Sequence, residues 1–300
     1  MDLYLENALQ CSKKTTNNYS TSFSLGVGLL DKSIRRAIYA IYGFVRIADE
    51  IVDTFFDHNQ KVMLQEFKIE TFQAIEQGIS TNPIIHSFQW AVNTYKIEHH
   101  LIDSFLNSMA VDLNKTRFTK NEYKNYIYGS AEVVGLMCLR VFCHEKPELY
   151  ADLVHPARKL GEAFQKVNFL RDMEADYDER GRTYFPNIDF NCFTEDDKKH
   201  IETEIDSDFN QALQGIAFLP LNSRFGVYLA YSYYLQLLKK IKLTPAEKLK
   251  QKRIRISNFQ KFSMLFFVYL KFTVRQGSVV KQKAKSQQSL IKSNTQQAYA

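Results

Sequence analysis

The chain has 300 residues, 45% of them hydrophobic, with only 11 Gly and 6 Pro and a formal net charge of +6. This length and apolar content can supply a substantial buried core, and the scarcity of helix-breaking residues favours an all-helical protein. No apolar run approaches the roughly 18 residues that span a bilayer, no secretory signal is visible, and the four cysteines lack metal-binding spacing, so we expect a cytoplasmic protein.

The positive charge is concentrated at the C-terminus. Residues 239–300 contain fifteen Lys or Arg and one acid, Glu247, so the remaining chain carries a net charge of −8. Apolar side chains interrupt this basic segment, which favours peripheral contact with an anionic membrane, at its inner face, over nucleic-acid binding. From 282 to 300 the sequence is polar and predicts a disordered tail, leaving 1–281 as a single domain.

Helical periodicity dominates the chain from its beginning. The longest irregular connection is expected at 179–196, where Gly181 and Pro186 break any helix. Arg180 and Arg182 in this segment either close a lid over a bound anion or face solvent, and the sequence leaves both alternatives open. We expect helices at 5–16, 31–55, 60–78, 83–95, 99–113, 121–143, 147–153, 156–178, 197–217, 222–241 and 246–270.

The segment "YAIYGFVRIADEIVD", residues 39–53, carries polar side chains in otherwise apolar surroundings. On a helix, Tyr42, Arg46, Asp49 and Asp53 form one narrow stripe, because spacings of three and four residues keep side chains on one face. One arginine cannot neutralise the three acids of this segment, and buried carboxylates are costly without a cation. The stripe therefore either faces solvent along a thin edge or lines a polar cavity that binds a cation.

A second acidic stripe follows at "GEAFQKVNFLRDMEADYDE", residues 161–179. Gln165, Asn168, Asp172 and Asp176 lie within about 80° of arc on one helix face. Two facing stripes would bring four carboxylates together, which repel one another unless cations are bound. Oxygen ligands of this kind suit Mg²⁺, which bridges protein carboxylates to substrate phosphates.

Together these motifs resemble the squalene/phytoene synthase family over about residues 19–261. The resemblance begins at "YSTSF", where Ser20 and Phe23 match the family's Ser-x-Ser-Phe, and continues at Tyr128 of "YIYGSAEVVGLMC". The first acidic stripe reads Asp-Glu-x-x-Asp where many members begin Asp-Asp. The other matching positions are Arg46, Asp49 and Asp53 in the first aspartate motif, Gln165, Asn168, Arg171, Asp172 and Asp176 in the second, and Tyr234 and Arg253.

The resemblance implies an all-α, single-domain isoprenoid-synthase-type fold with a central cavity between the two motifs. It implies Mg²⁺, or alternatively Mn²⁺, held by Asp49, Asp53, Asn168, Asp172 and Asp176. It further implies diphosphate contacts from Arg46, Arg171 and Arg253 and substrate contacts from Ser20 and Gln165. The cavity wall would include Tyr42, Tyr128, Phe23 and Tyr234, whose rings or hydroxyl groups can stabilise carbocations.

The resemblance also implies a prenyltransferase that joins two geranylgeranyl diphosphate molecules head to head, giving phytoene through a cyclopropylcarbinyl diphosphate. The nearest alternative is a C30 squalene or dehydrosqualene synthase that uses farnesyl diphosphate, with NADPH needed only for squalene. A non-catalytic binding or assembly relative is a further alternative, although such a protein is expected to lose aspartates from one motif. The oligomeric state is not predicted.

Overall fold

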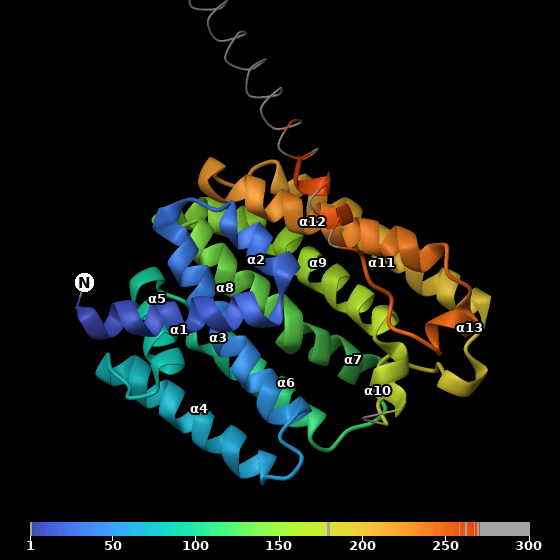
Figure 1. The fold of residues 1–300 in the computed structure, drawn as a ribbon, viewed down its shortest axis with the longest axis horizontal. Coiled ribbons are helices and arrows are strands. Elements are labelled where there is room, and N and C mark those ends of the chain that lie inside the picture. The colour runs from blue at the N-terminus through green and yellow to red at the C-terminus, as the bar shows by residue number, and fades with distance from the viewer. Residues whose placement is uncertain are drawn as a thin grey trace, which may run out of the picture. The chain divides into compact units, whose positions relative to one another are not determined.

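The computed structural model describes residues 2–178, 181–257, 259–261, 263–266, 268 and 270, and within them it contains helices and no β-strand, as expected (Figure 1). The chain divides into two compact units, residues 1–255 and 256–300, and the site described below lies in the first. The predicted tail, 282–300, lies outside the described residues. No helix in the described part is long and apolar enough to cross a membrane.

The first half of the chain contains α1 (Leu3–Tyr19), α2 (Thr21–Gly28), α3 (Lys32–Asp53), α4 (Gln60–Gln77), α5 (Pro83–Tyr95), α6 (His99–Asp112), α7 (Lys120–Ile127), the π-helical turn η1 (Tyr128–Glu132) and α8 (Val133–Phe142). The second half contains α9 (Pro147–Arg171), α10 (Met173–Asp178), the 3₁₀ turn η2 (Phe190–Cys192), α11 (Glu195–Ile216), α12 (Leu221–Lys242) and α13 (Ala246–Leu249).

Helix α3 is buried among its neighbours, and this position fixes the first acidic stripe. The Asp31 carboxylate caps its N-terminus by accepting a hydrogen bond from the Ser33 backbone N–H at 2.9 Å. Phe44 is fully buried and stacks on Phe88 of α5 with 3.8 Å between ring centroids. Burying such a ring stabilises the fold by about 1.5–3 kcal/mol. The polar edge of α3 that carries Asp53 faces the end of α6 and the segment after α10, where Arg182 lies 2.9 Å from the Asp53 carboxylate.

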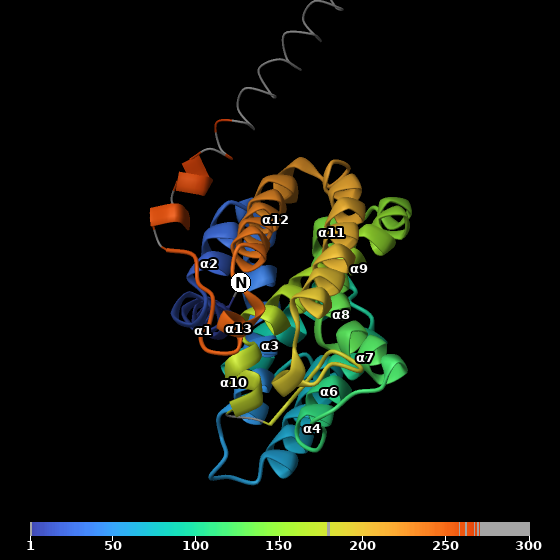
Figure 2. The same ribbon diagram turned by 90° about the vertical axis from the view of Figure 1, so that its right-hand side faces the viewer.

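Helices α9, α11 and α12 pack against one another (Figure 2). A buried ion network joins α9 to α11: the Lys166 ammonium lies 2.8 Å from Asp208, which is also 2.9 Å from Lys159. Both partners of the first pair are almost completely buried. Breaking a buried pair by removing one partner costs about 3–5 kcal/mol. The network therefore holds α9, which carries the second acidic stripe, in place.

The expected break between helices at 153 and 156 is wrong, because α9 continues through Pro156. The proline ring packs against Gly215 of α11, where a Cβ would lie 2.4 Å from it. This tertiary packing compensates for the backbone hydrogen bond that proline removes.

The expected helix 246–270 begins at the predicted residue but does not continue as predicted. Helix α13 ends at Leu249, and residues 253–257 have no regular secondary structure. Arg253, Ile254 and Arg255 alternate between polar and apolar side chains, and Ile254 is buried. This alternation has the period of an extended chain, which buries every second side chain.

Candidate active site

The first acidic stripe lies on α3, facing α6 and the segment that follows α10. Burial raises the pKa of Asp49 to about 7; Arg46 opposes this shift, and Asp53 and Asp112 add to it. A carboxyl group placed near two other carboxyl groups favours its protonated form. The stripe is therefore electrostatically unfavourable in the absence of a bound cation, as the sequence predicts for a cavity-lining position.

Arg46 is engaged outside the aspartate pair. Its guanidinium forms an ion pair with Glu50, one turn along α3, and lies 4.4 Å from the centroid of the Tyr19 ring. Glu50 is buried, so the acid in the middle of the first motif has a structural partner. A diphosphate contact by Arg46 stays a prediction.

The second stripe spans the junction of α9 and α10. Helix α9 ends at Arg171, but the backbone N–H of Asp176 donates to the Asp172 carbonyl at 2.9 Å, so the helical spacing of the stripe persists. Asp172 accepts hydrogen bonds from Arg171 and lies 2.7 Å from Arg253. Burial lowers the pKa of Arg171, but Asp172 outweighs this effect and the net shift is upward. Two predicted diphosphate contacts thus meet at one metal-ligand candidate.

Aromatic and amide side chains line the space between α2, α3, α9 and α12. Tyr234 on α12 donates a hydrogen bond to the Asn168 Oδ1 at 3.3 Å, and the Asn168 amide donates to Gln165 at 3.4 Å. Tyr42 stacks on Phe23 with 4.4 Å between ring centroids. Burial raises the pKa of Tyr42 to about 12, so its hydroxyl group keeps its proton at neutral pH.

Ser20 lies at the junction of α1 and α2, where its Oγ accepts a hydrogen bond from the Phe23 backbone N–H at 3.2 Å. This bond caps α2, the helix on which the Phe23 ring stacks against Tyr42 of α3. The shift in the pKa of Tyr42 includes an opposing side-chain contribution from Ser20. The structure therefore gives Ser20 a clear role in helix capping, and direct substrate contact stays a prediction.

Tyr128 contacts a part of α9 that is distant from the second aspartate motif. It begins η1, and the Arg158 guanidinium on α9 lies 5.2 Å from its ring centroid. Arg158 precedes Asp172 by fourteen residues, or about 21 Å of helix. The adjacent Gly129 permits close packing of η1 on α6, because a Cβ there would lie 1.9 Å from the Ser108 Oγ. The small residues here serve helix packing.

Two residues that the sequence did not assign to the site, Asp112 and Arg182, connect its parts. The Arg182 guanidinium lies 2.9 Å from the Asp53 carboxylate and donates a hydrogen bond to the Asp112 carbonyl at 2.9 Å. The Arg182 backbone N–H donates to the Asp176 carbonyl at 2.8 Å. Arg182 thus contacts both aspartate motifs: its side chain contacts Asp53 of the first, and its backbone contacts Asp176 of the second.

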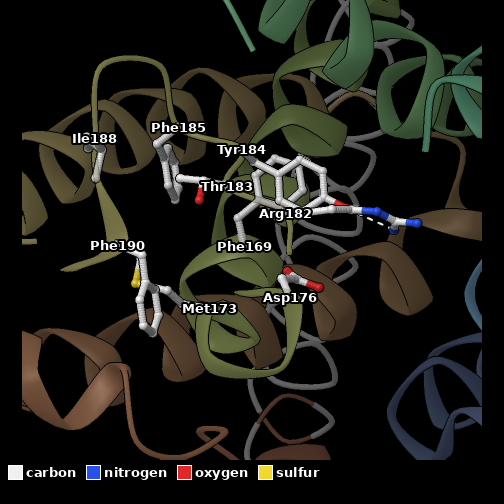
Figure 3. A pocket seen from close by; sticks show the side chains of 9 residues that line it. All are labelled: Phe169, Met173, Asp176, Arg182, Thr183, Tyr184, Phe185, Ile188 and Phe190. Atoms are coloured by element: carbon white, nitrogen blue, oxygen red, sulfur yellow. Dashed lines mark hydrogen bonds between the residues drawn. The ribbon is translucent and has the colours of Figure 1, made fainter. Parts of the chain in front are cut away.

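A small pocket opens beside this junction (Figure 3). Figure 3 shows Asp176 and the Arg182 side chain at one side of it, next to the stacked rings of Phe169 and Tyr184, whose centroids are 4.1 Å apart. Its wall comprises Phe169, Met173, Asp176, Arg182, Thr183, Tyr184, Phe185, Ile188 and Phe190. Aromatic side chains thus lie beside Asp176 in this pocket.

The donor set fits a divalent cation whose coordination is completed by substrate. Within the described part of the chain, no three carboxylate, histidine or cysteine side chains enclose a metal by themselves. Mg²⁺ is typically bound by one or two carboxylates together with water and substrate phosphates. Burial is the main cause of the raised pKa of Asp49, and the nearby Asp53 and Asp112 carboxylates add to it. Oxygen donors are available from Asp49, Asp53, Asn168, Asp172 and Asp176.

Comparison with known proteins shows to which family the chain belongs. The family model described as squalene/phytoene synthase matches residues 16–260. The chain belongs to the squalene/phytoene synthase family. Members of this family are prenyltransferases, so the predicted enzyme class is confirmed.

Two curated members of the squalene/phytoene synthase family illustrate the range of relatives. The chain is 25% identical over 260 residues to a phytoene synthase from Arthrospira platensis, covering 78% of this chain and 84% of that protein. It is 28% identical over 210 residues to a 4,4'-diapophytoene synthase from Staphylococcus haemolyticus (strain JCSC1435), covering 68% and 71%.

Solved structures of the squalene/phytoene synthase family show the same fold. A dehydrosqualene synthase crystallised with a ligand superposes with a TM-score of 0.75 at 23% identity, covering 90% of this chain and 98% of that one. The squalene synthase HpnC from Alicyclobacillus acidocaldarius superposes with a TM-score of 0.69 at 18% identity, covering 85% and 98%. The isoprenoid-synthase-type fold is confirmed, and its central cavity stays a prediction.

The sequence interpretation missed Asp112 and left Arg182 undecided between a lid and a solvated loop. Asp112 ends α6 and accepts a hydrogen bond from the Tyr126 hydroxyl at 2.8 Å. A signal was present for Arg182, since "RGRTYFP" combines it with apolar neighbours that an exposed loop would rarely carry. No comparable local signal marks Asp112. Arg180 lies outside the described residues.

Proposed function

We propose that this chain condenses two molecules of geranylgeranyl diphosphate head to head, forming phytoene through a cyclopropylcarbinyl diphosphate in the first committed step of carotenoid biosynthesis. The observation that carries the proposal is the meeting of both aspartate motifs at Arg182, with the Asp53 carboxylate 2.9 Å from its guanidinium. This convergence, together with membership of the squalene/phytoene synthase family, supports a site for a prenyl diphosphate. It argues against a non-catalytic relative, which has no need for two paired motifs.

In this proposal, Asp49, Asp53, Asn168, Asp172 and Asp176 hold Mg²⁺, or Mn²⁺, against the substrate diphosphates. The bound metal would supply positive charge that stabilises the departing diphosphate. Metal binding by these residues is a proposal that rests on their oxygen donors and on the raised pKa of Asp49.

The basic residues complete the diphosphate site in this proposal. Arg171 and Arg253 already lie at Asp172, where they can bind diphosphate oxygens that approach the metal. Arg46 and Gln165 extend the same polar surface. Fixed cations directed at developing negative charge lower the barrier to ionisation without reorganising during the reaction.

The aromatic residues protect the carbocation in this proposal. Phe23 and Tyr42 stack on each other and Tyr234 stacks on Phe164, and these rings are proposed to supply π faces to the carbocation. Tyr42 stays protonated because burial raises its pKa to about 12. A neutral phenol attracts a carbocation and does not react with it as a phenolate would. Tyr128 and Ser20 are proposed to serve farther along the substrate.

A C30 synthase is the second candidate function. The likeness to a diapophytoene synthase over 68% of this chain supports it. In that case farnesyl diphosphate is the substrate, and NADPH is needed only if the product is squalene. The two candidates differ in the depth of the pocket, and therefore in the length of the prenyl chain that fits.

The deciding experiment incubates the purified full chain and Mg²⁺ separately with geranylgeranyl and farnesyl diphosphate, with and without NADPH, and identifies the hydrocarbons by mass. A C40 triene is the expected product. A C30 product would replace the proposal by its alternative. No product from either substrate would contradict both and support a non-catalytic role.

We further propose that the enzyme acts in the cytoplasm, in peripheral contact with the inner face of an anionic membrane through its basic C-terminal region. Within that region, Lys240, Lys248 and Lys252 surround Leu243, whose side chain is 87% exposed. Cations around an exposed apolar side chain suit a lipid surface. The strongly hydrophobic product also favours release into lipid.

A further inference from the structure

Arg182 is a buried cation in the acidic part of the site. Its side chain is only 7% exposed, and its guanidinium lies 2.9 Å from Asp53 and 3.8 Å from the Asp112 carboxylate. Burial lowers the pKa of Arg182, but Asp112, Tyr184 and Asp53 outweigh this effect and raise it, so the group stays charged. A permanent positive charge therefore occupies the region between α3 and α6.

The surrounding backbone holds this residue in place. The Arg182 backbone N–H donates to the Asp176 carbonyl at 2.8 Å, and the Thr183 backbone N–H donates to the Thr116 carbonyl at 2.8 Å. On the next residue, the Tyr184 ring is buried and stacks on Phe169. A segment anchored on both sides by backbone hydrogen bonds and by aromatic packing suits a fixed element better than a closing lid.

The position of Arg182 sets the charge balance of the first aspartate motif. Asp53 and Asp112 both contact Arg182, and the Arg46 guanidinium on the same helix as Asp53 pairs with Glu50. A cation in contact with Asp53 stabilises the ionised carboxylates and at the same time opposes a second cation nearby. Arg182 can therefore stabilise the empty motif and weaken its affinity for a bare divalent ion.

We propose that Arg182 is a positioning residue that acts as a built-in counter-charge: it holds Asp53 and the end of α6 in place and makes divalent-metal binding depend on diphosphate. This inference rests on the proposed function, because it takes Asp53 as a metal ligand. In the free enzyme, Arg182 repels a metal ion at Asp53. When a diphosphate arrives, its negative charge compensates for both cations, so metal and substrate bind together.

The test measures Mn²⁺ binding by electron paramagnetic resonance, using the full chain with and without inorganic pyrophosphate. The wild type is expected to bind Mn²⁺ weakly alone and at least tenfold more tightly with pyrophosphate. Arg182→Gln should bind Mn²⁺ alone at least tenfold more tightly than the wild type, and Arg182→Lys should resemble the wild type. Arg140→Gln is the control, because Arg140 also pairs with an acidic side chain at the N-cap of another helix, Glu98, away from the site.

Thermal unfolding in a chelator supplies the second readout. Arg182→Gln should unfold at a lower temperature than the wild type, and Asp112→Asn in the same chain should recover part of the loss, because it removes one of the acids left uncompensated. Added Mn²⁺ should restore Arg182→Gln but not Arg140→Gln. These shifts remain measurable even if the variant is inactive.

Two outcomes would overturn the inference in distinguishable ways. In the first outcome, the wild type binds Mn²⁺ with pyrophosphate, but without pyrophosphate Arg182→Gln binds Mn²⁺ no more tightly than the wild type does. The proposed role of Arg182 is then wrong, and the proposed function is unaffected. In the second outcome, neither protein binds Mn²⁺ even with pyrophosphate. The proposed metal site is then wrong, and so is the role of Arg182 that depends on it.

Discussion

Replacing Asp49 by Asn should stabilise the metal-free protein at pH 8 while removing most of its activity. Burial raises the pKa of this carboxyl group from 3.8 to about 7 in the native state. An unfolded chain has an aspartate pKa of about 3.9, so between about pH 4 and 7 the native state binds the proton more tightly. The stability contributed by this group is therefore lost as the pH rises through that interval.

The magnitude follows from the difference between these pKa values. A difference of about three pKa units between the native and unfolded states corresponds to about 4 kcal/mol of folding free energy. Asp49 is partly accessible to solvent, so solvent screening reduces this figure, and we expect a penalty of roughly 2 kcal/mol at pH 8. Asparagine has nearly the same volume and no charge, so Asp49→Asn should avoid the penalty.

Urea unfolding in a chelator at pH 4.5, 6 and 8 tests the argument. The free energy of unfolding of Asp49→Asn should exceed that of the wild type by roughly 2 kcal/mol at pH 8, with little difference at pH 4.5. Asp57→Asn, at an exposed position just after α3, is the control and should follow the wild type. If Asp49→Asn is instead less stable than the wild type at pH 8, the ionised Asp49 carboxylate stabilises the fold and the expected penalty is wrong.

Three further predictions concern the second motif, the helix packing and the tail. Asp172→Asn should lower turnover at least 100-fold without unfolding the chain, since it removes charge at a proposed metal ligand; near-normal turnover would contradict the metal assignment. Lys166→Met should lower the free energy of unfolding by about 2–3 kcal/mol, less than the roughly 3–5 kcal/mol of an uncompensated buried charge, because Lys159 still pairs with Asp208. The exposed control Lys199→Met should change this free energy by less than about 1 kcal/mol in the same urea titration. Deleting 282–300 should leave turnover unchanged and at most weaken binding to anionic vesicles; loss of folding would show that the tail is structural.

The sequence alone determined the helical class and both aspartate stripes, because these features depend on local spacing. The distance between Asp49 and Asp53 along a helix is fixed by the helical repeat, and the same is true of Asp172 and Asp176. The apolar residues around them predicted burial, and the structure places Phe44 and its neighbours in the core.

Local reasoning failed where tertiary packing overrides local preference. Pro156 predicts a helix end, but its ring packs on Gly215 across α9 and α11, and the helix continues. The end of α13 depends on the burial of Ile254, whose backbone N–H donates to the Arg171 carbonyl at 3.4 Å. Neither contact can be inferred from the flanking sequence.

The composition of the site was likewise decided by the tertiary structure. Asp53, Asp112 and Arg182 are separated by 59 and 70 residues, and the ion pair between the first and the last joins α3 to the segment after α10. Periodicity relates residues a few positions apart, whereas charge compensation between distant segments depends on how helices pack. The sequence therefore determined which acids share a helix face, and only the folded structure decided which cation meets them.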